Sequence, residues 1–239
     1  MPEKFTFAYR AVMAVSKPIC RQWGRLEVSG LEHMPLEGPV LLAGNHDSYW
    51  DPIAIGVAAR PRRQIKALAK STLWKVGVVG KVLDGMGQIP IDRGKGDVGA
   101  LSRAIEELRA GACIGIFPEG TRSQGRVLRA RSGFGRLAEA VPEAQIVCCT
   151  VEGTVDIPRF PKRPTLRVRF FPPAGGNLRP GESAGELSAR LLEEIRSHAP
   201  IEACGRKPRP VRVEAPETPE GTADALARET AGTTSDGHA

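Results

Sequence analysis

Short apolar runs alternate with segments of helical character along most of this 239-residue chain. The clearest apolar runs are residues 40–44, 65–69, 113–117 and 145–151. A chain that alternates in this way favours an α/β domain, in which helices cover a largely parallel sheet. The sequence contains no internal repeat. We therefore expect a single α/β domain with a mixed, mostly parallel sheet flanked by helices.

Weaker patterns complete the expected order of elements. Residues 26–28 and 165–170 are expected to be strands, and 88–93 an edge strand, because Pro90 cannot donate to a central ladder. Ser71 is the predicted cap of a helix that runs towards Gly85. The remaining helices are expected over 53–59, from Asp97 to Gly111 with Leu101, Ile105 and Leu108 inward, over 134–141, and over 186–198 with Leu187, Leu191 and Ile195 inward.

Both ends of the chain differ from its middle. Residues 1–23 are expected to contain an amphipathic helix that runs up to Pro18 and has basic residues at its ends. One face of that helix either lies in a lipid interface or packs on the domain, and it is formed by Phe5, Tyr9, Val12 and Ser16. Residues 206–239 lack aromatic side chains and are rich in Pro, Glu, Thr, Gly and Ala, so we expect a disordered tail. The domain is then expected to span 24–205.

The formal net charge of +7 indicates partners that carry negative charge. Aromatic residues make up only 5% and do not interleave with basic ones as base stacking requires, so phosphorylated ligands and membrane surface rank above nucleic acid. Five cysteines without a Cys-x-x-Cys pair favour a reducing compartment and neither a zinc site nor a disulfide framework. No apolar run reaches the roughly 18–20 residues that span a bilayer.

A histidine and an aspartate follow the apolar run that ends at Gly44. On one continuous helix His46 and Asp51 would point about 140° apart, since each residue turns by about 100°. A turn at His46, followed by a helix with Asp51 as N-cap and Pro52 at its first position, would instead bring the imidazole to the carboxylate. Taken alone, such a pair is more simply a turn residue and a cap than a base and its orienting group.

Two further polar clusters follow strand-like runs, at 92–93 and 119–122. In open α/β sheets the ligand crevice lies at the carboxyl ends of the strands, so the three clusters could converge on one cleft. Arg93 and Arg122 could then grip a phosphate by bidentate hydrogen bonds, next to a histidine base.

Three motifs in this order resemble those of the glycerolipid acyltransferases, typified by 1-acylglycerol-3-phosphate (lysophosphatidate) acyltransferases. The motifs are Asn45-His46-Asp47-Ser48-Tyr49-Trp50-Asp51-Pro52, Gly87-Gln88-Ile89-Pro90-Ile91-Asp92-Arg93 and Phe117-Pro118-Glu119-Gly120-Thr121-Arg122-Ser123. The resemblance covers residues 25–200 and implies a glycerol-3-phosphate acyltransferase-like fold. The family's fourth motif, a Val-Pro-Val-like strand, is poorly kept, because cysteines occupy this part of 146–151.

The resemblance implies that His46 accepts the proton of the acceptor's hydroxyl while that oxygen attacks a thioester, and that Asp51 holds the imidazole. The substrate's own alcohol would replace the serine of a hydrolytic triad. The implied phosphate-binding residues are Arg93, Glu119, Gly120, Thr121 and Arg122. Asn45 and Ser48 would support the first motif.

The implied reaction makes phosphatidate from lysophosphatidate in phospholipid biosynthesis. Acyl-CoA or acyl carrier protein would be the co-substrate, with no cofactor, no metal and no nucleic-acid partner. Because the acceptor is a lipid, we expect peripheral or monotopic attachment at the cytoplasmic face of the cell membrane.

Three alternatives stay open at this point. The acceptor could be another lysophospholipid or a glycolipid. A thioesterase or lipase could use the same pair, but it would need a serine nucleophile, and the chain has no Gly-x-Ser-x-Gly elbow. A non-catalytic lipid-binding protein would have no need of both His46 and Asp51.

Overall fold

The computed structural model describes residues 5–92, 97–161 and 163–202. Its seven-stranded sheet has the order β1-β7-β6-β2-β5-β3-β4. Neighbouring strands are parallel except β6 and β7, so the predicted mixed, mostly parallel sheet is confirmed. The strands are β1 (Glu27–Ser29), β2 (Val40–Gly44), β3 (Ile65–Lys70), β4 (Ile89–Ile91), β5 (Cys113–Ile116), β6 (Gln145–Glu152) and β7 (Arg167–Phe171).

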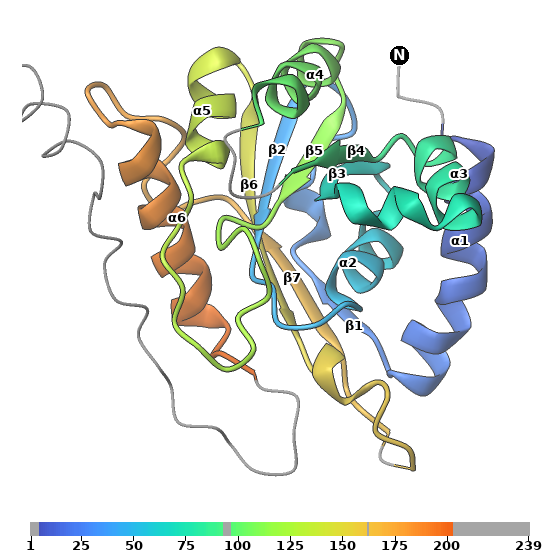
Figure 1. Cartoon of the computed structure of the whole chain (residues 1–239). Helices are drawn as coiled ribbons and strands as arrows, with labels where there is room; N and C mark the ends of the chain where they lie inside the picture. Colours follow the sequence, from blue (N-terminus) through green and yellow to red (C-terminus); the bar gives the residue numbers. More distant parts are fainter. Residues whose placement is uncertain (1–4, 93–96, 162, 203–239) are drawn as a thin grey trace, which may run out of the picture.

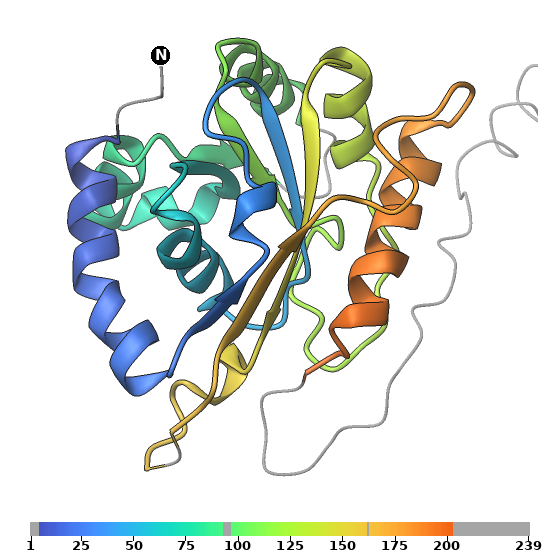
Figure 2. The same ribbon diagram turned by 180° about the vertical axis from the view of Figure 1, so that it is seen from behind.

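Helices cover both faces of the sheet (Figures 1 and 2). The α-helices are α1 (Phe7–Pro18), α2 (Asp51–Ala59), α3 (Gly77–Gly85), α4 (Val98–Arg109), α5 (Gly133–Ala140) and α6 (Ala184–His198). Shorter helical turns are the π-helical η1 (Ile19–Trp23) and the 3₁₀ turns η2 (Leu31–His33), η3 (Ser71–Lys75) and η4 (Thr154–Asp156).

The central strand β2 is buried on both sides, and this explains its unbroken apolar sequence. Val40 and Leu42 pack into the core that includes residues of α1 and α2. Leu41 and Ala43 point the other way, into the core that includes residues of α4, α5 and α6. The polar segment that follows β2 therefore starts from a strand that is buried in the middle of the sheet.

Helix α1 packs on the domain through its inner face. Tyr9, Met13 and Ser16 are buried. Gly56 of α2 allows this approach, because a Cβ there would lie 3.0 Å from the Met13 sulfur. The helix does not stop at Pro18, since the chain continues helically as η1 to Trp23. No helix among residues 5–92, 97–161 and 163–202 combines the length and apolar character needed to cross a membrane.

Two local predictions were wrong. The helix expected over 71–85 is divided into η3 and α3, and Ser71 caps neither, because its hydroxyl donates to Asp92. In α4, Asp97 does cap the helix as predicted. Leu108 is buried with Ala100 and Ala104, and Leu101 and Ile105 are partly buried against the same core, so the predicted inward side of α4 is confirmed.

Candidate active site

Three segments meet where the neighbouring strands β6, β2 and β5 end. The segment after β2 carries the first motif, and the segment after β5 carries the third. They are joined by the backbone of Ser123, whose N–H donates to the carbonyl of His46 at 2.8 Å. The third segment is the turn η4 after β6, whose Thr154 contacts Asp51 and Ser48. Convergence of the first and third clusters, predicted from parallel strand ends, is confirmed.

His46 and Asp51 lie in direct contact. Nδ1 of the imidazole is 2.9 Å from Oδ2 of Asp51. Asp51 is fully buried, and His46 is 7% exposed. The ring of Phe117 stacks on the imidazole at a centroid distance of 4.2 Å and an interplanar angle of 11°. The ring plane is thus held from one side while Nδ1 is held by the carboxylate, which leaves Nε2 as the nitrogen that can meet a substrate proton.

Asp51 is not the N-cap of α2, contrary to the prediction. Trp50 occupies that position and makes no side-chain cap. The Asp51 carboxylate instead faces back into the loop, where Oδ2 accepts the N–H groups of Asp47 and Ser48, each at 2.7 Å. Oδ1 accepts the hydroxyl of Thr154 from η4. These donors stabilise the charged carboxylate and fix the oxygen that binds His46.

Asn45 and Ser48 both tie the first motif to the segment formed by β6 and η4. The Asn45 amide pairs with both backbone groups of Val151 on β6, at 2.8 Å each, and so extends the sheet beyond β2. The Ser48 hydroxyl donates to the carbonyl of Thr154 at 3.3 Å and accepts the N–H of Trp50 at 3.2 Å. Neither side chain has a recorded contact with the imidazole within the described part of the chain.

The third motif is tied to the first through Glu119. Its Oε2 accepts the backbone N–H of His46 at 2.8 Å. Its Oε1 accepts two N–H groups of Arg196, from Nε at 3.1 Å and from Nη2 at 2.6 Å. Burial raises the pKa of the Glu119 carboxyl above its ordinary value, against the opposing attraction of Arg196. Both of its oxygens therefore bind protein groups.

The other residues predicted to bind the phosphate have a different environment from Glu119. Gly120 adopts a left-handed conformation with φ of 69°, which glycine accepts without strain. Thr121 is exposed. The Arg122 guanidinium lies over the ring of Tyr49, 3.5 Å from its centroid, and no carboxylate within the described residues pairs with it. Arg93 lies outside the described residues.

Sequence reasoning missed four contributors to the site. Ser123 ends the third motif, and its hydroxyl donates to the carboxylate of Asp47. Thr154 and Phe117 acquire their roles only when strand ends are brought together. Arg196, in the last turn of α6, binds both Asp47 and Glu119. No local pattern distinguishes Arg196 from the other arginines of the chain, because its partners are 77 and 149 residues away in sequence.

The cysteines of β6 are structural. Cys148 and Cys149 point into opposite cores and are fully buried. Burial raises the pKa of the Cys148 thiol to about 12 and that of Cys149 well above its ordinary value. A raised pKa disfavours the thiolate that nucleophilic chemistry requires. Within the described residues, no three His, Cys, Asp or Glu side chains are arranged to hold a metal ion.

A family model described as Acyltransferase matches residues 25–158, more than half of the chain. The match includes the whole of the first and third motifs. The chain belongs to the acyltransferase family. The matched segment runs from β1 to η4 and carries the His46–Asp51 pair.

Two relatives named 1-acyl-sn-glycerol-3-phosphate acyltransferase are similar to this chain. The protein from Borreliella burgdorferi is 38% identical over 104 residues, which are 42% of this chain and 40% of the relative. The protein from Bacillus subtilis is 30% identical over 115 residues, 48% of this chain and 57% of the relative. The chain thus spans about half the length of these relatives.

The fold also has a solved counterpart. The crystal structure of the 1-acyl-sn-glycerophosphate (LPA) acyltransferase PlsC from Thermotoga maritima superposes with a TM-score of 0.55 at 22% identity. The match covers 79% of this chain and 80% of that one. At this identity the likeness shows the shared fold, and the predicted fold class is confirmed.

Proposed function

We propose that this acyltransferase moves a fatty acyl group from a thioester, acyl-CoA or acyl carrier protein, to the free hydroxyl of lysophosphatidate. The observation that carries the proposal is the buried His46–Asp51 pair within the segment that matches the family. The names of the similar proteins support lysophosphatidate as acceptor.

In the proposed reaction the acceptor's hydroxyl oxygen attacks the thioester carbonyl carbon and its proton passes to Nε2 of His46. Asp51 holds the opposite nitrogen, which fixes the tautomer and stabilises the imidazolium. The tetrahedral intermediate then collapses, the carbon–sulfur bond breaks, and the thiolate takes the proton back from His46. The pair is regenerated without a change in the protein.

A serine-dependent thioesterase or lipase is less well supported. The hydroxyl of Ser48 is directed at the carbonyl of Thr154, and that of Ser123 at the carboxylate of Asp47. Within the described residues no serine has a recorded bond to the imidazole of His46. The nucleophile is then the alcohol that the acceptor brings.

The acceptor's phosphate is proposed to bind Arg122, with help from Arg93. Arg122 has the charge and the open partner site, while stacking on Tyr49 limits its motion. Gly120 and exposed Thr121 form the backbone of the same loop. Glu119 contributes indirectly, because its oxygens hold the loop to His46 and Arg196.

We further propose that the molecule meets the membrane through the outer surface of α1 and α3. The two helices lie side by side (Figures 1 and 2), with Ala8 against Gly85. Their outward apolar side chains are exposed, with Phe7 at 87% and Val78 at 77%. Exposed apolar surface on neighbouring helices is typical of a membrane contact.

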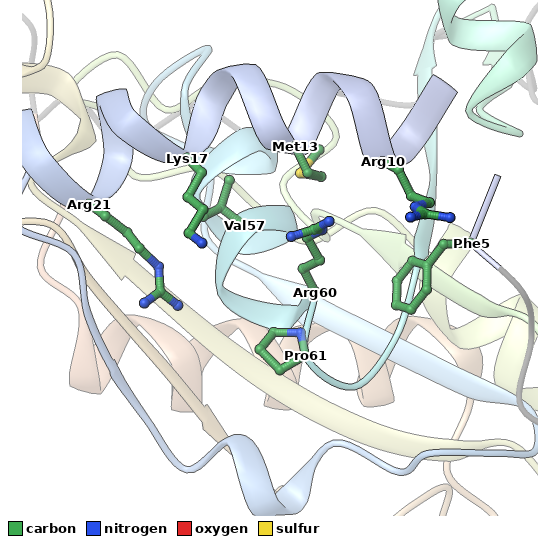
Figure 3. A pocket seen from close by; sticks show the side chains of 8 residues that line it. All are labelled: Phe5, Arg10, Met13, Lys17, Arg21, Val57, Arg60 and Pro61. Carbon is green, nitrogen blue, oxygen red and sulfur yellow. The ribbon is translucent and has the colours of Figure 1, made fainter. Parts of the chain in front are cut away.

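Basic side chains border this surface. Arg10 and Lys17 of α1 and Arg21 of η1 extend towards Arg60 at the end of α2, and the four line a groove together (Figure 3). Among the described residues, the lining of that groove includes no acidic side chain. The groove therefore favours anionic lipid headgroups at the level where α1 would meet the bilayer. Attachment at the cytoplasmic face stays a prediction.

An acceptor panel tests the proposed function. The purified protein is incubated with palmitoyl- or oleoyl-CoA and with lysophosphatidate, lysophospholipids of larger headgroup or a glycolipid, and products are identified by lipid mass spectrometry. Phosphatidate is the expected product. Acylation of a different acceptor and not of lysophosphatidate would contradict the proposed acceptor. Release of free fatty acid without any acylated lipid would favour a thioesterase.

A further inference from the structure

We propose that Arg196 is a positioning residue of this site, which holds the two motif loops together and balances the negative charge around His46. The inference deepens the proposed function and rests on it for its kinetic tests. It concerns a residue beyond the segment matched by the family model, which ends at 158.

The guanidinium of Arg196 binds two carboxylates at once. Nη1 and Nη2 donate to the two oxygens of Asp47, each at 2.9 Å, in a bidentate fork. Nε and Nη2 donate to Oε1 of Glu119 at 3.1 and 2.6 Å. Both carboxylate side chains are 1% exposed and that of Arg196 is 13% exposed, so the three charges are largely out of water. Only the planar fork of arginine makes such a double contact.

Each carboxylate passes the constraint on to the catalytic pair. Glu119 accepts the backbone N–H of His46, so Arg196 is linked to the histidine through this one residue. The backbone N–H of Asp47 donates to Asp51, so Arg196 is linked to Asp51 through Asp47. Arg196 thereby contacts neither His46 nor Asp51, yet it fixes the residues that place both of them.

Helix α6 explains how Arg196 reaches the site. Its apolar face, with Leu187, Leu191 and Ile195, is fully buried against the sheet. Arg196 is the next residue of α6 after Ile195 and is turned about 100° from it around the helix axis. Its side chain therefore leaves the apolar face and reaches Asp47 after β2 and Glu119 after β5. Burial lowers its pKa, but hydrogen bonds and charges of Asp47 and Glu119 outweigh this and raise it overall. The arginine is thus a fixed cation.

Charge is the second part of the argument. The recorded charged groups around His46 are Asp47 and Asp51 from the segment after β2, Glu119 from the segment after β5, and Arg196 from α6. Without Arg196, the negative charges of Asp47, Asp51 and Glu119 would be unbalanced near His46 and near the site proposed for an anionic phosphate. Negative charge near an imidazole favours its protonated form. Arg196 supplies the positive charge that offsets these carboxylates.

The test compares Arg196→Met and Arg196→Lys with Arg190→Met. Arg190 is a matched control because it lies on the same helix and pairs with Glu182, away from the motif loops. We expect Arg196→Met to lower kcat 10- to 100-fold and to move the acid limb of the kcat profile to higher pH, since kcat reports the substrate complex. Arg196→Lys should restore the profile but not the full kcat, because lysine keeps the charge and loses the fork.

A second readout is independent of turnover. Nuclear magnetic resonance follows the titration of the His46 ring, assigned with His46→Ala, in each variant. The midpoint should move to higher pH in Arg196→Met and stay in Arg190→Met. If wild-type protein transfers no acyl group, the proposed function fails while this readout still decides the role of Arg196. An unchanged midpoint, or equal kinetic losses in Arg196→Met and Arg190→Met, would overturn the inference. Should Arg196→Met not fold, Arg196→Lys with wild-type kcat would overturn it.

Discussion

The proposed phosphate-binding role of Arg122 depends on its guanidinium being available to a ligand. Its guanidinium stacks on Tyr49 and has no carboxylate partner within the described residues. We therefore expect Arg122→Ala to raise KM for lysophosphatidate about 10- to 100-fold, the scale of about 1.4–2.8 kcal/mol, and to leave KM for acyl-CoA nearly unchanged. Initial rates with each substrate varied separately measure this. Arg129→Ala, on an exposed position of the same loop, is the control, and equal effects on both substrates would contradict a phosphate role.

Glu202 should make stability depend on pH. Burial raises its pKa from 4.5 to about 7, while the N–H of Gly153 opposes this and Asp47, Glu152 and Asp156 add to it. The folded state therefore holds the proton more tightly than the unfolded chain. The stability that the protonated carboxyl contributes is complete below pH 4.5 and is lost as the pH rises through 7.

Glu202→Gln removes that dependence. Relative to the wild type, its free energy of unfolding should rise by roughly 1–3 kcal/mol between pH 4.5 and 8. Urea denaturation at a series of pH values measures the difference. A difference that stays constant over this range would show that Glu202 does not titrate as described.

At the scale of elements, α5 and α6 depend on one glycine. A Cβ at Gly135 would fall well inside van der Waals contact with the carbonyl oxygen of Ala184, whereas a Cβ at Gly133 on the same helix would meet nothing. Gly135→Ala should therefore cost about 2–4 kcal/mol of stability, in the range of overpacking and strain. Gly133→Ala should change it by less than about 1 kcal/mol. Thermal unfolding of both variants decides, and equal midpoints would refute the close approach.

Elements with a clear period could be predicted from the sequence, and those decided by long-range partners could not. The buried strand β2 and the inward residues of α6 follow directly from apolar pattern. The sequence predicts Asp51 as a cap because it shows the helix that follows, and it does not show that the loop amides of Asp47 and Ser48 bind the carboxylate. The predicted cap at Ser71 is wrong for the same reason, because its hydroxyl donates to Asp92, a partner that the local sequence does not show.

The site itself divides in the same way. The contact of His46 with Asp51 is local and could be expected from the turn between them. Phe117 and Arg196 reach the site only because the parallel sheet aligns strand ends and α6 packs back across them. Arg93, part of the second motif, lies outside the described residues and stays a prediction.

For the whole molecule, the position of α1 changes how membrane binding is tested. Deleting the helix would remove the buried core residues Tyr9 and Met13 and disturb the fold, so a loss of binding would be ambiguous. Phe7→Asp and Val78→Asp instead alter only exposed side chains. We expect the double variant to bind vesicles containing anionic lipid at least tenfold more weakly in sedimentation assays. Val98→Asp, at an equally exposed valine on α4, should bind as the wild type does. Unchanged binding of the double variant would place the membrane contact elsewhere.

The central claim is that His46 is the base of an acyl transfer, oriented by Asp51. The most direct measurement is the rate of phosphatidate formation from lysophosphatidate and acyl-CoA by wild type, His46→Ala and Asp51→Asn, each with its thermal unfolding recorded. Removal of a positioned base costs about 10²–10⁴ in rate, so we expect losses of that size in both variants with the fold retained. A folded His46→Ala protein that transfers acyl groups at the wild-type rate would contradict the account.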